Sequence, residues 1–345
     1  MVQVLVAIFG ISLLVIVHEA GHYFMARAFG IRVIRFSIGL GPVLAKYQPK
    51  GSPTVFQICA IPFLAYVMIA GMNPAEEADP NDPGLFPNKS ILARVLTIFG
   101  GPFANYLAAS LMIFGLAVTG WRDEVPSEPM VVESVDATSP AGQAGIKAGD
   151  VIVEANGKPI RNVRELIDVT SPRANQATTY VVKRDGKTLA PMTIVPRDSG
   201  GRGLIGVAPK YELRVRQMPL GEAGALAVTL PWTLTVRNLE GMVDLIKRRS
   251  TEGLTGPVGM GKLVAQQAEK GVYAFVGILI MISVALGYFN LLPFPALDGG
   301  RLVFLGYEII TRRRPNERIE AAVHAVGLLF LLGVIALVTL RDVVS

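Results

Sequence analysis

Four long runs of apolar residues divide the chain, and each is long enough to cross a lipid bilayer as a helix. They lie at residues 2–24, 95–119, 272–297 and 321–340. The last three contain no Asp, Glu, Lys or Arg. Because about 20 apolar residues in helical form span a bilayer core, the pattern predicts a polytopic α-helical membrane protein with four transmembrane helices.

The pattern changes between the second and third runs. In residues 126–210 the apolar runs become short and alternate with polar positions, which predicts a β-rich domain, and "DG" at 185–186 predicts a hairpin. The stretch "SPAGQAGIKAGDVIVEANGKPI" at 139–160 resembles the core of a PDZ domain, and the matching positions are Gly145, Gly149, Asp150, Asn156 and Gly157. A PDZ domain binds an extended peptide along a sheet edge, whereas the plainer interpretation is a small β domain with ordinary turns.

The segment that follows is less apolar than the four runs. "AGALAVTLPWTLTV" at 223–236 is uncharged, but it is short and Pro231 interrupts it. We expect a helix that lies at the membrane interface, with a fifth, broken span as the alternative. The predicted parts are therefore an N-terminal membrane part (1–120), a PDZ-like domain (126–210), an interfacial amphipathic helical linker (211–271) and a C-terminal membrane part (272–345).

Charge supports the membrane assignment and predicts an orientation. Only 17% of the residues are charged, against about 25% in soluble proteins. Lys and Arg gather at 27–35, 89–94 and 301–318, so we expect residues 27–94 and 299–320 in the cytoplasm. Both termini and residues 120–271 are then extracytoplasmic. The net charge of +6 comes without a basic, aromatic stripe, so no nucleic acid partner is expected.

The first run has another interpretation, as a signal peptide cleaved after "ARA" at 26–28. The start "MVQ" lacks the positive charge of such peptides, which favours a retained helix. The single cysteine, Cys59, excludes an internal disulfide framework.

The first run ends in "HEAGH" at 18–22. His18 and His22 are four residues apart, so a helix places both imidazoles on one face. In an HExxH motif the two histidines bind Zn²⁺ and the glutamate, here Glu19, acts as general base. Polar groups at membrane depth are costly and usually functional, which favours this chemistry over a pair of surface histidines. A catalytic zinc site needs a third protein ligand.

Two residues are candidates for that third ligand. Asp298 ends the third run within "FNLLPFPALDGG" at 289–300, where Pro293 and Pro295 interrupt the helix. The first and third runs both cross inward, so Asp298 reaches the depth of the two histidines. His324 in the fourth run lies near the same side, but we favour Asp298 and interpret His324 as a packing residue.

Taken in order, these motifs resemble the site-2 protease family of intramembrane zinc metalloproteases, in particular its bacterial RseP-type members with one PDZ domain. Further similar stretches are "RFSIGLGP" (35–42), "FPNKSILAR" (86–94), "GGPFAN" (100–105) and "LTGPVGM" (254–260). The resemblance implies that His18, His22 and Asp298 bind Zn²⁺ and that Glu19 activates water. It also implies a protein of the bacterial inner membrane that cuts transmembrane segments of single-span proteins, such as an anti-sigma factor or a signal-peptide remnant, in regulated intramembrane proteolysis.

The resemblance also points to substrate contacts. Asn105 and Asn290 match polar positions near the family's site. The family's cytoplasmic loop "PLGGYVKM", a β-hairpin that dips into the membrane and holds the substrate strand, reads "PFLAYVMIAG" here, at 62–71. Tyr66 and Val67 are the contacts that this loop would offer. Leu64 and Ala65 replace two glycines. Since glycine adopts positive φ and allows close backbone approach more easily than other residues, the replacement bears on the geometry of the loop and on substrate selection.

Two other functions fit parts of the sequence. A membrane-anchored PDZ protein with an inactive metal site would recruit partners, but the complete ligand set speaks against decay. A zinc transporter would be expected to spread its ligands along a pore instead of pairing one HExxH motif with a base.

Overall fold

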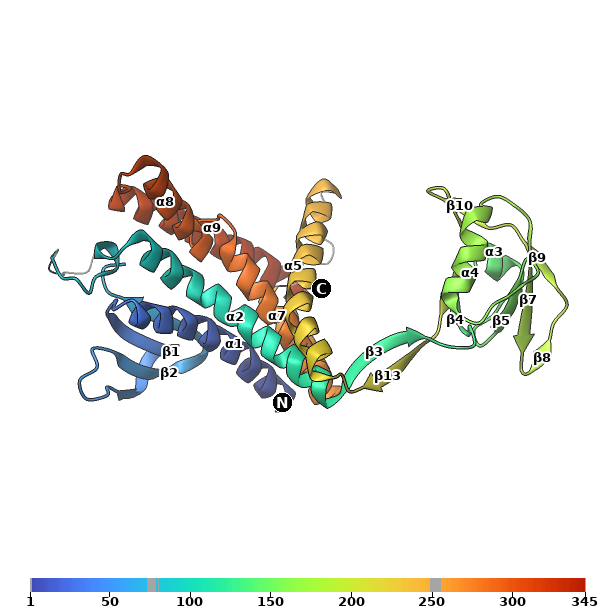
Figure 1. Ribbon diagram of the computed structural model, residues 1–345, viewed down its shortest axis with the longest axis horizontal. Coiled ribbons are helices and arrows are strands. Elements are labelled where there is room, and N and C mark those ends of the chain that lie inside the picture. Colours follow the sequence, from blue (N-terminus) through green and yellow to red (C-terminus); the bar gives the residue numbers. More distant parts are fainter. Residues whose placement is uncertain (1, 73–78, 80, 249–255, 345) are drawn as a thin grey trace. The chain divides into compact units, whose positions relative to one another are not determined.

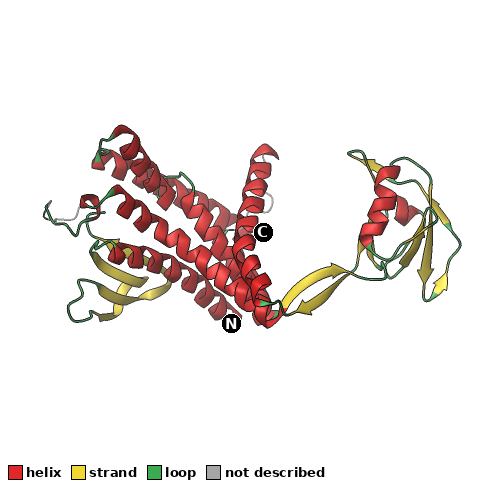
Figure 2. Cartoon of the chain, viewed as in Figure 1, coloured by secondary structure: helices red, strands yellow, loops and turns green. Residues whose placement is uncertain are grey.

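The computed structural model describes residues 2–72, 79, 81–248 and 256–344, and they form two compact units. Unit 1 combines Met1–Val118 with Pro219–Ser345, and unit 2 is Thr119–Met218 (Figures 1 and 2). Of the motifs above, the first two residues of "LTGPVGM" lie outside the described residues. The domain boundaries drawn from the sequence remain predictions.

Unit 1 contains four helices that are long and apolar enough to cross a membrane, as the hydropathy pattern predicted. They are α1 (Val2–Ala28), α2 (Ile91–Gly120), α7 (Val272–Leu291) and α9 (Glu317–Val344). The third predicted run extended to residue 297, but α7 ends at Leu291. Pro293 and Pro295 explain this end, because proline lacks the backbone N–H and clashes with the preceding turn. A separate helix, α8 (Asp298–Thr311), begins directly at Asp298. The chain is therefore a multi-pass membrane protein.

The ends of the first two helices follow from their sequences. Gly30 stands in the left-handed region (φ 65°) after α1, and the N–H groups of Gly30 and Ile31 donate to the carbonyls of Arg27 and Ala26. This is the Schellman arrangement that closes a helix. At the start of α2 the Ser90 hydroxyl accepts from the Ala93 N–H at 3.3 Å, as an N-cap does.

Beside α1 lies a sheet made from two long, bent strands, β1 (Val33–Tyr47) and β2 (Val55–Ile69) (Figure 1). Each strand pairs twice with the other, so that the segments lie in the order 65–69, 33–38, 55–58 and 43–47. β1 bends where Gly39 and Gly41 adopt positive φ, which glycine adopts at little cost. The segment 65–69 is thus an edge of this sheet. A short 3₁₀ helix, η1 (Phe86–Asn88), precedes α2.

The segment after unit 2 departs from its predicted form. Residues 211–216 were expected in a helical linker, but Tyr211–Arg216 is strand β13, paired antiparallel with β3 (Trp121–Pro126). Pairing between residues about 90 positions apart in the sequence is a tertiary effect that the local pattern does not report. Helix α5 (Leu220–Arg248) then contains Pro231, and it is not among the four helices of membrane-spanning length and hydropathy in the described chain.

Helix α6 (Pro257–Glu269) packs among the long helices. Val264 is fully buried against Ala7 of α1 and Ile278 of α7. Asp342, near the end of α9, caps the first turn of α6. The Asp342 carboxylate accepts a hydrogen bond from the Gly259 N–H at 2.8 Å. A carboxylate suits the positive end of a helix dipole. This part of the predicted interfacial linker therefore joins α1, α7 and α9.

Unit 2 is a small β-rich domain with two short helices. Its main sheet has the order β6 (Lys158–Pro159), β5 (Val151–Ala155), β7 (Thr178–Arg184) and β8 (Lys187–Thr188), with β9 (Met192–Ile194) also paired to β7. Asp185 and Gly186 both adopt positive φ between β7 and β8, which confirms the predicted "DG" hairpin. The remaining elements are β4 (Val132–Val135), α3 (Pro140–Gln143), α4 (Val163–Thr170), η2 (Ser171–Arg173), β10 (Arg197–Ser199), β11 (Arg202–Leu204) and β12 (Val207–Pro209).

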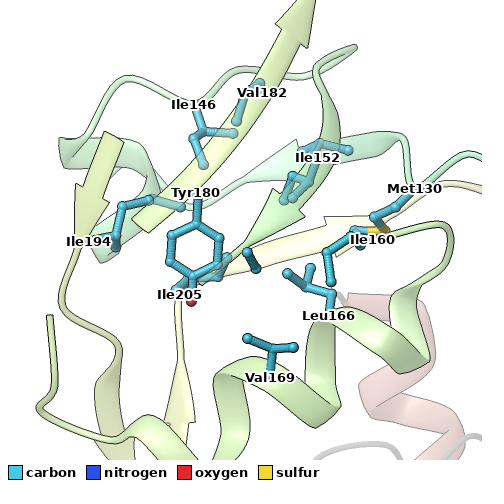
Figure 3. Close-up of a cluster of buried hydrophobic side chains, with 13 residues drawn as sticks. Met130, Ile146, Ile152, Ile160, Leu166, Val169, Tyr180, Val182, Ile194 and Ile205 are labelled. Carbon is cyan, nitrogen blue, oxygen red and sulfur yellow. The ribbon is translucent and has the colours of Figure 1, made fainter. Parts of the chain in front are cut away.

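The core of unit 2 brings α4 onto the sheet. Tyr180 and Val182 of β7 are fully buried with Ile152 of β5, and Leu166 and Val169 of α4 close over them (Figure 3). The Tyr180 hydroxyl lies 3.0 Å from Thr170 Oγ1, so the buried ring keeps a polar partner.

An ion pair stabilises the edge of this domain. Arg184 donates from Nε and a terminal nitrogen to both oxygens of the buried Asp150, at 2.7 and 2.8 Å. The same carboxylate accepts the Lys147 N–H at 2.8 Å. The hydrogen bonds from Arg184 lower the pKa of Asp150, so its charged form stabilises the fold.

Candidate metal centre

His18, His22 and Asp298 meet at one point between α1 and the start of α8. The Nε2 atoms of the histidines lie 3.2 Å apart, and Asp298 Oδ2 lies 3.2 Å from that of His18 and 3.3 Å from that of His22. An ion bonded tetrahedrally at about 2.0–2.1 Å separates its ligand atoms by about 3.3 Å. Two imidazoles and a carboxylate are a common donor set for Zn²⁺. The three residues therefore fit a zinc ion in both spacing and chemistry.

The burial of these groups also favours a cation between them. His18 and His22 are 8% and 9% exposed, and Asp298 Oδ2 is fully buried and accepts no hydrogen bond among the described residues. A buried carboxylate oxygen without a partner is costly. A metal ion bonded to Oδ2 would remove that cost.

The histidine rings are oriented by groups on α2. His22 Nδ1–H donates to the Thr97 carbonyl oxygen at 2.9 Å, because a carbonyl can only accept. That hydrogen bond leaves the lone pair on Nε2, where the metal would bind. Sequence reasoning missed Thr97, since its contribution is a backbone oxygen that any residue type provides.

Asn105 orients the other ring. Its amide lies against His18, with the amide nitrogen 3.3 Å from Nδ1, while its buried Oδ1 meets no partner in the described chain. A metal on His18 Nε2 requires the proton on Nδ1, and the amide end that faces Nδ1 is then the oxygen, which accepts from Nδ1–H. Ser283 of α7 holds this residue by donating to the Asn105 carbonyl at 2.9 Å.

Helices α1 and α2 approach closely because glycines stand at their contact, in "HEAGH" on α1 and in "GGPFAN" on α2. A Cβ at Gly21 would overlap the Gly100 carbonyl, and one at Gly100 would lie 2.6 Å from the Gly21 carbonyl oxygen. A Cβ at Gly101 would overlap His22 Nε2 and lie 2.8 Å from His18 Nε2. Small residues at membrane helix contacts let backbones approach in this way. The "GGP" at 100–102 was quoted for its resemblance, and its steric role appears only in the structure.

Asp298 is presented by the tight connection from α7 to α8. A Cβ at Gly299 would overlap the Leu292 carbonyl, so the first turn of α8 folds back against the end of α7. Ala296 has φ 75°, a costly conformation for a residue with a side chain. Its N–H donates to His324 Nδ1 at 2.9 Å. His324 therefore fixes the connection and is not part of the ligand cluster, as the sequence interpretation favoured.

Glu19 lines a cavity of about 490 Å³ together with the three metal-binding candidates. Tyr66, Val67, Met68 and Ile69 line the same cavity, and they belong to the sheet edge 65–69. The Val67 backbone N–H lies near the Glu19 carboxylate. Asn290 lines the cavity as well, with its amide nitrogen donating to the Leu286 carbonyl at 2.9 Å.

A buried ion pair ties α2 to α8. The Arg94 guanidinium donates to both oxygens of Glu308, at 2.7 and 2.9 Å, and the two side chains are 7% and 10% exposed. These hydrogen bonds lower the pKa of Glu308. Because α2 orients the histidines and α8 carries Asp298, this ion pair helps to fix the ligand spacing.

The structure thus gathers the predicted site residues in one region. His18, His22, Asp298, Glu19, Asn105, Asn290, Tyr66 and Val67 all lie at the cavity or in contact with its ligands. Their assigned roles remain proposals. Sequence reasoning missed Thr97, Gly101 and Arg301, which follows Asp298 by one helical turn and lines the same cavity.

Known proteins with similar sequences include peptidases and zinc metalloproteases, which agrees with a zinc site at this position. Residues 6–334 match the sequence model of Peptidase family M50. Similar proteins include two named "Putative zinc metalloprotease", one from Mesorhizobium japonicum (32% identical, covering 97% of this chain and 96% of that protein) and one from Nostoc (32%, covering 96% and 93%). The Metalloprotease MmpA of Caulobacter vibrioides is 30% identical, covering 94% of this chain and 91% of its own.

Among solved structures, the matches involve small domains. The PDZ domain of an SdrC-like protein from Listeria monocytogenes is 25% identical, with a TM-score of 0.22, and covers 25% of this chain and 93% of its own. The HtrA3 PDZ domain bound to a phage-derived ligand is 18% identical, with a TM-score of 0.15, and covers 27% and 91%.

Proposed function

Because this chain belongs to peptidase family M50, a family of zinc-dependent metalloproteases, we propose that it cleaves peptide bonds within the transmembrane segments of single-span membrane proteins. The observation that carries the proposal is the arrangement of His18, His22 and Asp298 around one point, with Glu19 in the same cavity. No observation favours the alternative of an inactive recruitment protein.

The proposed roles follow from the positions of these side chains. His18, His22 and Asp298 hold the metal, while Asn105 and the Thr97 carbonyl fix the ring orientations. Zn²⁺ bound there supplies Lewis acidity that polarises the scissile carbonyl and lowers the pKa of water to about 7. Glu19 takes the proton from the attacking water and returns it to the leaving amine.

The sheet edge gives the substrate a place to unwind. A helix hides its carbonyls in its own hydrogen bonds, so the scissile segment must first open into an extended form. Residues 65–69 form an edge of the β1–β2 sheet and line the cavity. A substrate strand paired there would recover main-chain hydrogen bonds, as in β-strand addition. Tyr66, Val67 and Asn290 are the proposed contacts, and Leu64 and Ala65 adjoin them.

The setting follows from the charge pattern. We propose that the protein lies in a bacterial inner membrane with both termini and unit 2 outside and the metal centre toward the cytoplasm. Unit 2 would act as a PDZ domain that binds peptide or screens substrates by their external size. An anti-sigma factor or a signal-peptide remnant is a fitting substrate class.

Reconstitution tests this function. The full chain is placed in proteoliposomes with an epitope-tagged single-span protein, and mass spectrometry of the fragments locates the cut. We expect a cut within the apolar span, stopped by a zinc chelator and restored by added Zn²⁺. A cut confined to the soluble parts of the substrate, or one that persists at full rate in Glu19→Gln, would overturn the proposal.

A further inference from the structure

A second cavity adjoins the catalytic one. It measures about 350 Å³ and lies among the start of α2, α8 and the start of α9. Met72, Ile98 and Arg301 line both cavities, so the two are neighbours that share a wall. The second cavity has no role in the chemistry described above.

The charges in this second cavity do not balance. Three guanidinium groups face two carboxylates, which leaves a formal charge of +1. Glu308 already accepts hydrogen bonds from Arg94, and Arg314 Nε lies 3.8 Å from Glu308 Oε1. Arg301 feels the charges of Asp298 and Glu320 but donates no hydrogen bond to any described residue. Within the described chain, all the N–H donors of Arg301 are thus without an acceptor.

Two further donors in the lining are buried without an acceptor. Arg94 is 5% exposed, and its Nε–H meets no partner among the described residues. His324 accepts the Ala296 N–H on Nδ1, so its proton is on Nε2, and that atom is also buried without a partner there. Buried donors normally have acceptors. Both N–H groups lie within the wall of the cavity, so an anion inside it would meet the excess positive charge of the lining chiefly through Arg301.

Peptide hydrolysis makes such an anion next to this cavity. The water oxygen bonds to the carbonyl carbon, the C–N bond breaks, and the products are an amine and a new α-carboxylate. A carboxylate is costly at membrane depth unless a cation accompanies it. Arg301 follows Asp298 by three residues on α8, so both lie on one side of that helix.

We propose that the second cavity is a product site, in which the guanidinium of Arg301 binds the carboxylate that cleavage creates. This inference rests on the proposed function. It predicts that the fragment bearing the new C-terminus leaves the metal through this cavity and is held there before release.

Equilibrium binding tests the site. The probe is a fluorescent hexapeptide of alternating alanine and leucine that ends in a free carboxylate, compared with the same peptide as an amide. The zinc-loaded full chain is held in phosphatidylcholine nanodiscs, as wild type, Arg301→Gln, Arg301→Lys and Arg313→Gln. Arg313 is a matched control, because it is exposed and lines neither cavity.

We expect wild type and Arg313→Gln to prefer the carboxylate by roughly ten- to hundredfold, the factor given by a charged hydrogen bond. Arg301→Gln should bring the two affinities within about threefold, while Arg301→Lys keeps part of the preference and shows that the fold survives. Zn²⁺ itself attracts carboxylates, so a full preference in Arg301→Gln would overturn the proposal. Loss of the preference in wild type when phosphatidylglycerol is added would also overturn it, by assigning the cavity to a lipid phosphate. Because binding is measured, the result is separable from any failure to observe proteolysis.

Discussion

A single methyl group at position 101 should separate the metal ligands. The contact of a Cβ at Gly101 with His18 Nε2 would be 2.8 Å, and the contact with His22 Nε2 would be closer still. Both atoms are the proposed metal-binding atoms, so α1 and α2 must move apart before Gly101→Ala can fold. Metal sites keep their ligand distances within about 0.2 Å, and a displacement of several tenths of an ångström exceeds that tolerance.

The magnitude follows from comparable perturbations. Loss of a hydrogen-bond partner to a ligand weakens metal binding about 10–100-fold. Because the methyl group presses on the ligand atoms themselves, we expect Gly101→Ala to weaken Zn²⁺ binding by at least about 100-fold, or about 2.7 kcal/mol. The overpacking should also lower the free energy of unfolding by about 1–3 kcal/mol.

A competition assay measures the effect. Purified protein in detergent micelles is titrated with a chromophoric chelator, and bound zinc is counted by mass spectrometry. Gly115→Ala is the matched control, since it lies on the same helix and its Cβ meets nothing within 4 Å. Equal zinc affinity for Gly101→Ala, Gly115→Ala and wild type would refute the packing argument.

Three further predictions concern groups that support the site or the fold. Asn105→Leu removes the acceptor for His18, so zinc affinity in the same assay should fall about 10–100-fold. Glu308→Gln leaves Arg94 buried and unpaired, so it should cost about 3–5 kcal/mol and lower the thermal midpoint in detergent. Asp150 has a pKa below its usual value, so its contribution to stability is present above about pH 4 and is lost as pH falls through the lowered pKa. Asp150→Asn should remove that part of the acid sensitivity and cost about 2–3 kcal/mol, because Arg184 is partly exposed.

Exposed carboxylates in the same units serve as controls for Glu308→Gln and Asp150→Asn. Glu240→Gln on α5 and Asp168→Asn on α4 change an exposed side chain and should leave stability within about 0.5 kcal/mol. If either control matched its buried counterpart, the loss of charge and not the loss of the pair would explain the effect.

The hydropathy pattern predicted the four long helices, and the HExxH spacing predicted that His18 and His22 share a helix face. Both are local signals: an apolar run of helical length and two histidines at i and i+4 determine what a helix presents. The "DG" hairpin was equally local. The position of Asp298 relative to the histidines was also inferred from sequence, through the direction in which two runs cross the membrane.

Features that depend on distant pairing were not predicted. Strand β13 was placed in a helical linker, because its partner β3 lies about 90 residues earlier in the chain. The double pairing of β1 and β2, which makes 65–69 an edge, requires bends that the pattern of apolar residues does not show. Likewise, the contribution of Gly101 is the absence of a side chain at a helix contact, and that contact is visible only after α1 and α2 have packed.

In the proposed function, one Zn²⁺ held by His18, His22 and Asp298 works with Glu19 as the base. The most direct measurement compares wild type with Glu19→Gln in the same proteoliposomes, recording zinc per chain and the rate of cleavage of a tagged single-span substrate. We expect about one zinc per chain in both proteins, with cleavage lost in the variant. Cleavage by Glu19→Gln at the wild-type rate, with its zinc retained, would contradict the assignment of Glu19 as the base.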